Sequence, residues 1–214
     1  MKKTNTILQG LLLLSVLILS SGWQPTGAQD SFALEPRSQL WIEGGSTVNA
    51  FTCRAQNVEG YGFFEDDMAG ANGHDARAEV VVLVETFDCG KQRMNRDFYE
   101  ALKADAFPMI RFTLDEAYVI GQPDAEDRIY RLRVLGRLTL AGVTRRIEMR
   151  VLGWPLADGR YRVTGKERLL MSDFEIDRPT ALLGLIRARD RILVRFNLVA
   201  VSGTTPTTTT HSTQ

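Results

Sequence analysis

Apolar and polar residues alternate along most of the chain after residue 39. The alternation is clearest in four segments: residues 77–85, 130–140, 143–151 and 191–201. A period of two predicts strands that bury one face and expose the other. Weaker alternation marks four further strand candidates, at residues 40–42, 48–55, 110–120 and 160–170.

Two dipeptides predict tight turns between consecutive strands. Ala141-Gly142 joins two of the strong candidates, and Asp158-Gly159 joins the next pair. Because hairpins join antiparallel neighbours, they favour an antiparallel sheet over parallel β-α-β units. About eight strands with one apolar face each must then close as a barrel or pack as a sandwich.

One segment follows a helical period instead. Asn95 is a candidate cap for a helix over residues 95–104, in which Phe98, Ala101 and Leu102 share one face. Pro108 is expected to end this helix. The pattern also allows a second short helix at residues 181–186.

The two ends of the chain follow neither period. Lys2 and Lys3 precede about a dozen apolar residues and then small residues, the layout of a secretory signal peptide. A retained anchor is the weaker alternative, because a membrane span needs about 20 apolar residues. We place cleavage after Ala28, and we expect a periplasmic or secreted protein.

The sequence divides the rest of the chain into a linker at residues 29–38, a domain at residues 39–202 and a disordered, Thr-rich tail at residues 203–214.

Charge is balanced overall and uneven locally. The chain has 26 basic and 26 acidic residues, so no positive excess points to nucleic acid. Residues 128–168, however, hold eleven basic and three acidic residues, a difference of +8. The simpler interpretation is an ordinary polar surface, on which acidic residues of neighbouring segments balance these basic residues. The alternative is a basic wall that docks weakly on an anionic membrane, formed by Arg131, Arg133, Arg137, Arg146 and Arg150.

No motif points to catalysis or to a metal. His74 and His211 are the only histidines, which argues against a His-rich metal site or a His-based triad. In Asp173–Asp177, three carboxylates alternate with two apolar residues, a pattern that could suit a cation or acid–base chemistry. An acidic outer face over an apolar inner face is the simpler interpretation. We therefore expect no enzyme activity, no metal and no required cofactor.

Residues 136–144, GRLTLAGVT, form the most specific motif of the chain. They are similar to the G-x-L-T-x-x-G-V-T hairpin of the YceI-like family of exported polyisoprenoid-binding proteins, and several other segments also resemble this family. Residues 102–112, LKADAFPMIRF, resemble the family segment that follows its helix. The family's segment before its last strands is similar to residues 171–174 and Pro179. Its first strands are similar to the region that contains Trp41, residues 46–48 and Phe51. A histidine often found in the family's first long strand is absent from residues 51–57.

The resemblance, which runs in order from about residue 40 to 200, implies an all-β fold with one or two short helices. The fold would be an antiparallel, lipocalin-like barrel of about eight strands around a long apolar tunnel. The implied ligand is an isoprenoid chain, often that of an isoprenoid quinone, held without catalytic residues. The expected function is therefore an exported carrier or sink for an isoprenoid lipid. A ligand-free structural or interaction module and an enzyme using residues 173–177 are the alternatives.

An eight-stranded barrel is just wide enough either to be filled by side chains or to hold one ligand. Fourteen apolar side chains are predicted to face its interior, and these are the candidate ligand contacts. They are Phe51, Val80, Val82, Phe112, Leu132, Val134, Leu138, Ile147, Met149, Val163, Phe174, Ile192, Val194 and Phe196. The sequence leaves open the ligand's head group and whether the protein forms a homodimer.

Cys53 and Cys89, the only two cysteines, are predicted to form a disulfide. Export would place them in an oxidising compartment. Both lie at or just beyond the ends of strands that a barrel would bring together.

Overall fold

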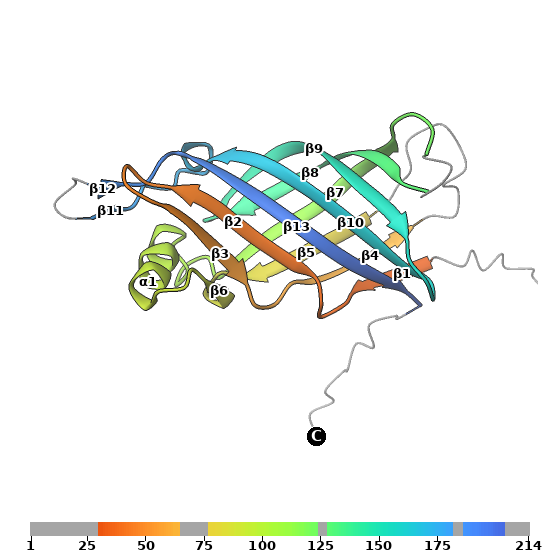
Figure 1. Cartoon of the computed structure of the whole chain (residues 1–214), viewed down its shortest axis with the longest axis horizontal. Coiled ribbons are helices and arrows are strands. Elements are labelled where there is room, and N and C mark those ends of the chain that lie inside the picture. The colour runs from red at the N-terminus through yellow and green to blue at the C-terminus, as the bar shows by residue number, and fades with distance from the viewer. Residues whose placement is uncertain (1–29, 65–76, 124–127, 182–185, 204–214) are drawn as a thin grey trace, which may run out of the picture.

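The computed structural model describes residues 30–64, 77–123, 128–181 and 186–203. Within these ranges the chain is built mainly from antiparallel β-strands, with one α-helix and two short 3-10 helices (Figure 1). None of the helices in these ranges has the length and apolar character needed to cross a membrane.

Eight strand positions close into an antiparallel barrel. The longest strands pair in chain order: β7 (Met109–Val119), β8 (Tyr130–Leu140), β9 (Val143–Pro155), β10 (Arg160–Leu170) and β13 (Arg191–Ser202). The ring is completed by β1 (Asp30–Leu34), β4 (Glu59–Phe64) and β5 (Arg77–Leu83). β1 also pairs with β13, and β5 pairs with β7. These eight strands therefore form a closed ring without a free edge strand. The predicted barrel is confirmed.

The sheet is extended at one end of the barrel by β2 (Gln39–Gly45), β3 (Ala50–Ala55) and β6 (Phe87–Asp88). β1 and β2 pair with successive parts of β13, so they act as two halves of one bent strand. Ser38 fixes the bend, because its hydroxyl accepts the Val199 N–H at 3.1 Å. β11 (Thr180–Ala181) and β12 (Ile186–Arg187) form a separate two-stranded sheet.

Both predicted hairpin turns are confirmed. Ala141 and Gly142 have φ values of 50° and 82°, and Asp158 and Gly159 have values of 62° and 69°. Left-handed conformation at both central residues is typical of type I′ turns, whose twist matches that of the strands they join.

The helix α1 (Gln92–Ala101) begins three residues earlier than predicted. Asn95 is therefore not its cap. It lies in the first turn, where its side-chain oxygen accepts the Cys89 N–H at 2.8 Å. The helix also ends before Pro108 is reached, because Lys103 adopts a left-handed conformation with φ of 54°, as residues just past a helix end often do.

Three other expectations need correction. The sequence predicts a linker at residues 29–38, but Asp30–Leu34 form β1. The alternation at residues 173–177 is that of a strand, but these residues do not form one, because η2 (Met171–Phe174) is followed by left-handed Glu175. The segment at 181–186 begins in β11 and ends in β12, and its residues 182–185 lie outside the described residues. The predicted signal peptide, His74 and residues 204–214 of the predicted tail also lie outside them.

The pairing between β9 and β10 is incomplete. It joins residues 151–155 to residues 161–165, whereas Lys166–Leu170 pair only with β13. Nearer to α1, η2 contacts both β9 and β10. These two strands therefore diverge toward the helical end of the barrel.

Candidate ligand cavity

A cavity of about 260 Å³ lies inside the barrel. Its wall is formed by side chains from β1, β2, β4, β5, β7, β8, β9, β10 and β13, and nearly all of these side chains are apolar. The period of two along each strand explains this composition, since alternate side chains of a barrel strand point inward.

Twelve of the fourteen predicted interior residues line this cavity: Val80, Val82, Phe112, Leu132, Val134, Leu138, Ile147, Met149, Val163, Ile192, Val194 and Phe196. The other two, Phe51 and Phe174, do not. Phe51 lies across Gly44 on β2 and lines a separate hollow formed by the β2–β3 turn and the start of β13. Phe174 is 1% exposed and belongs to the packed core near α1.

Sequence reasoning missed several lining residues for identifiable reasons. Phe32 and Leu34 lie on β1, within the predicted linker at residues 29–38. Ala117 faces inward because a β-bulge between Leu114 and Glu116 shifts the alternation along β7. Other lining residues continue the alternation already recognised and could have been found by extending it: Ala78, Ile110, Leu114, Leu140, Val151, Leu169, Leu198 and Ala200.

Two carboxylates also belong to the cavity lining. Glu79 is opposite Tyr61 in the sheet and forms an ion pair with Arg111. Glu167 is opposite Val194, on the inner face of the part of β10 that diverges from β9. Its carboxylate accepts the Arg168 N–H at 3.0 Å, so it satisfies a backbone donor of its own strand.

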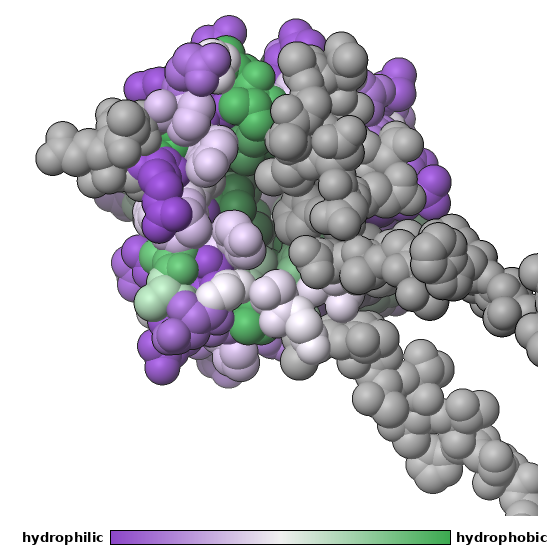
Figure 2. Space-filling view, turned by 90° about the vertical axis from the view of Figure 1, so that its right-hand side faces the viewer, coloured by the Kyte–Doolittle hydropathy of each residue, from purple (hydrophilic) through white to green (hydrophobic). Residues whose placement is uncertain are grey.

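One end of the barrel, called here the closed end, is packed shut by residues from α1, η1 (Val84–Thr86), β6 and η2. Val84, Phe87, Leu102, Phe174 and Ile176 are all less than 7% exposed there. Figure 1 shows α1 at this end, and Figure 2 views the opposite end, called here the mouth. In Figure 2, hydrophobic side chains gather in a central hollow between more hydrophilic parts of the surface.

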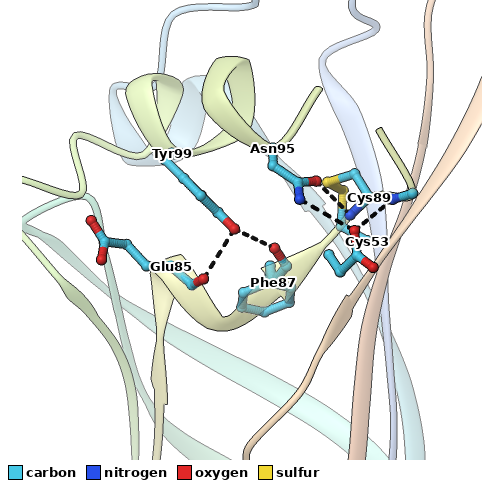
Figure 3. The surroundings of a disulfide bond; sticks show 8 residues. Cys53, Glu85, Phe87, Cys89, Asn95 and Tyr99 are labelled. Carbon is cyan, nitrogen blue, oxygen red and sulfur yellow. Dashed lines mark hydrogen bonds between the residues drawn. A yellow bond between two sulfur atoms is a disulfide. The ribbon is translucent and has the colours of Figure 1, made fainter. Parts of the chain in front are cut away.

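A disulfide and several hydrogen bonds attach α1 to the closed end (Figure 3). Cys53 and Cys89 are bonded, as predicted, and tie β3 to the segment before the helix. The Tyr99 hydroxyl donates to the carbonyls of Phe87 at 2.6 Å and Glu85 at 3.0 Å. Burial, followed by the charges of Asp88 and Glu85, raises the pKa of Tyr99, so the hydroxyl keeps its proton at neutral pH.

The η2 segment is attached to the start of β13 through one carboxylate. Asp190 accepts the Ser172 hydroxyl at 2.7 Å and the Ser172 N–H at 2.9 Å. These two hydrogen bonds hold the pKa of Asp190 below its usual value. They keep Phe174 and Ile176 inside the core.

The acidic residues of this segment do not form a site in the cavity. Asp173, Glu175 and Asp177 are exposed, whereas Phe174 and Ile176 between them are buried. Arg145 contacts this outer face, with its guanidinium 3.8 Å from the Glu175 carboxylate. The arrangement is an acidic exterior over an apolar interior.

A basic stripe runs along the outer face of β8 and β9. Its members, Arg131, Arg133, Arg137, Arg146 and Arg150, are all exposed. Arg133 lies directly opposite Arg150, and Arg137 lies directly opposite Arg146. Among the described residues only Arg137 of this stripe has an ion-pair partner, Asp115 at 3.0 Å. Arg133 instead stacks over the Tyr118 ring, 5.1 Å from its centre.

Residues 40–200 match the sequence model of the YceI-like domain. Three similar solved structures are BcnA of Burkholderia cenocepacia, a polyisoprenoid binding domain from Saccharophagus degradans implicated in plant cell wall breakdown, and a YCEI protein of Campylobacter jejuni. BcnA is 17% identical with a TM-score of 0.59, covering 76% of this chain and 95% of its own. The Saccharophagus domain is 16% identical with a TM-score of 0.60, covering 80% of this chain and 98% of its own. The Campylobacter protein is 16% identical with a TM-score of 0.50, covering 72% of this chain and 85% of its own.

At these identities the solved structures support the fold alone. A comparison with curated protein sequences finds no match. The family match, in contrast, extends over most of the chain and includes the hairpin motif at residues 136–144. This chain therefore belongs to the family of proteins with a YceI-like domain.

Proposed function

We propose that this protein binds a long isoprenoid lipid, a polyisoprenoid or an isoprenoid quinone, inside the barrel and acts as an exported carrier or sink. The observation that carries the proposal is the cavity, which is packed at the closed end and lined mainly by aliphatic and phenylalanine side chains. The polyisoprenoid binding domain from Saccharophagus degradans has the same fold, which supports the choice of lipid class.

The cavity suits a narrow, flexible chain. Its volume of about 260 Å³ lies below the roughly 300–1,000 Å³ typical of small-molecule sites. A chain that fills it gains about 0.8 kcal/mol for each methylene removed from water. The remainder of a longer chain would extend through the mouth.

Mass spectrometry of organic extracts from the purified protein tests this function. We expect a prenyl lipid in near-stoichiometric amount. Val134→Phe should reduce that amount, because Val134 lines the cavity and a larger side chain there fills it. Leu135→Phe is the matched control, since the next residue of β8 points outward. Protein that is purified empty and takes up no added prenyl lipid would instead be a ligand-free module.

The proposal includes a periplasmic or secreted location. It rests on the signal-like N-terminus and is supported by the disulfide, which persists in oxidising compartments. The intact mass of protein recovered from the periplasm or medium should correspond to a chain beginning at Gln29. Recovery of an uncleaved chain from the cytosol would contradict this part of the proposal.

The basic stripe is proposed to orient the protein on an anionic membrane from which lipid is taken. Each arginine near such a surface contributes about 1 kcal/mol. Arg131 lies toward the mouth, where its carbonyl accepts the N–H of exposed Ile120 at 2.7 Å. The stripe therefore reaches the end of the barrel at which a lipid chain would enter.

A further inference from the structure

Three phenylalanine rings in the cavity wall lie against glycines of neighbouring strands. The pairs are Phe32 on Gly62, Phe112 on Gly136 and Phe196 on Gly165. In each pair the glycine and the ring belong to adjacent strands of the barrel. Each ring occupies space that a side chain at the glycine would otherwise fill.

The space at these glycines is too small for a methyl group. A Cβ at Gly136 would lie 2.5 Å from the Cζ atom of Phe112 and 2.5 Å from the Thr113 carbonyl oxygen. A Cβ at Gly165 would overlap the Phe196 ring, with two ring carbons at 2.9 and 3.0 Å. Cβ atoms essentially never lie within 3.0 Å of another heavy atom. A Cβ at Gly165 would therefore require the Phe196 ring to move, and a Cβ at Gly136 would require both the Phe112 ring and the Thr113 backbone to move.

Backbone conformation does not explain these glycines. Neither Gly136 nor Gly165 has a positive φ, so an L-residue can adopt either backbone conformation. At Gly165 all three of the nearest atoms belong to the Phe196 ring. The glycine is therefore needed for the position of the ring.

We propose that Gly136 and Gly165 set the width of the cavity by leaving room for the tips of the Phe112 and Phe196 rings against the wall, and that this width admits methyl-branched isoprenoid chains. A methyl group at Gly165 would push the Phe196 ring into the cavity. A straight alkyl chain is narrower than a branched one and would still fit. This specificity rests on the proposed lipid-binding function.

Gly153 provides a matched control. It lies on β9 opposite Val163, a cavity residue, and so faces the interior. A Cβ there would meet only the flexible Leu132 side chain at 3.3 Å and the Arg162 carbonyl oxygen at 3.8 Å. Gly153→Ala therefore adds the same methyl group to the same wall without displacing a ring.

The test measures binding of geranylgeraniol, which is methyl-branched, and of eicosanol, which is straight, to delipidated protein. We expect Gly165→Ala to weaken geranylgeraniol binding by about tenfold or more, the usual effect of one misplaced methylene in an apolar pocket. Eicosanol binding should change much less, and Gly153→Ala should bind both probes as the wild type does. The double variant Gly165→Ala/Phe196→Leu should recover geranylgeraniol binding, because leucine is smaller than the displaced ring.

Crystal structures of the wild type and Gly165→Ala supply a readout that needs no lipid. The Phe196 ring should be displaced into the cavity of the variant. A Phe196 ring that keeps its wild-type position, unchanged geranylgeraniol binding by folded Gly165→Ala, or equal losses of binding for both probes would overturn the inference. A displaced ring in a protein whose wild type binds neither probe would support the role of Gly165 in cavity width and refute the proposed lipid-binding function.

Discussion

Ser172, within η2, and Asp190, the residue before β13, link these two elements. The carboxylate of Asp190 accepts two hydrogen bonds from Ser172, and this contact holds η2 against the first residue of β13. Phe174 and Ile176 follow directly and are buried. A small polar contact at the surface therefore keeps two large side chains in the closed end.

Replacing Asp190 with alanine should lower the melting temperature by a few degrees at pH 7. The folded-state pKa of Asp190 is depressed, so its stabilising effect is complete above the unfolded pKa of about 3.9 and is lost as pH falls through the lower folded value. Thermal melts of wild type and variant from pH 7 to pH 2 should therefore converge in acid. A constant difference in melting temperature between wild type and variant across this pH range would mean that the charge of Asp190 is not involved.

Replacing both cysteines with serine should destabilise the protein. The bond closes a loop with a sequence separation of 36 residues, for which the chain-entropy model gives at most about 4 kcal/mol. Urea unfolding of the oxidised wild type, the reduced wild type and the Cys53→Ser/Cys89→Ser variant measures the effect. The reduced protein and the variant should unfold at similar, lower urea concentrations. Coincidence of all three curves would contradict the prediction.

Among the elements, the long strands and their turns follow directly from the sequence. Alternation and the two turn dipeptides determine β8, β9 and β10 because each effect is local. The start of α1 depends instead on Asn95 bonding back to Cys89, a contact that the disulfide helps to position. Ala117 faces inward only because of a bulge in the pairing of β7 with β8, and that pairing is not visible in either strand alone.

The paired arginines of β8 and β9 predict salt-sensitive membrane binding. Like charges that face each other across a sheet destabilise it, so this arrangement costs stability that a binding partner would offset. In co-sedimentation at low salt, the wild type should bind anionic vesicles and not neutral ones. High salt should release it, because the attraction fades within a Debye length of about 10 Å at 0.1 M.

The variant Arg131→Ala/Arg133→Ala/Arg146→Ala should lose this binding while remaining folded. The matched control, Lys91→Ala/Arg93→Ala/Arg96→Ala, removes the same charge from α1 and the residue before it, at the closed end. Equal losses in the two variants would indicate a general charge effect. Full binding by the stripe variant, or no binding by the wild type, would exclude docking through the stripe.

For the whole molecule, a bound lipid should raise thermal stability. A ligand that binds only the folded state at 100 times its Kd adds about 2.7 kcal/mol. Each kcal/mol corresponds to about 2–4 °C for a chain of this size. Geranylgeraniol should thus raise the melting temperature of the delipidated wild type and of Leu135→Phe, and have a much smaller effect on Val134→Phe. An equal rise in all three proteins would place the lipid outside the cavity.

Under the proposed function, the packed closed end would impose an order on lipid exchange. In the part of the chain that the structure describes, α1, η2 and the buried side chains beneath them occupy that end, so a lipid bound as proposed would move along the barrel axis and through the mouth. The segment that enters first is then the last to leave, so loading and unloading are the same path taken in opposite directions. If the protein carries lipid between membranes, the receiving membrane would then have to meet the same end of the protein as the membrane that supplied it.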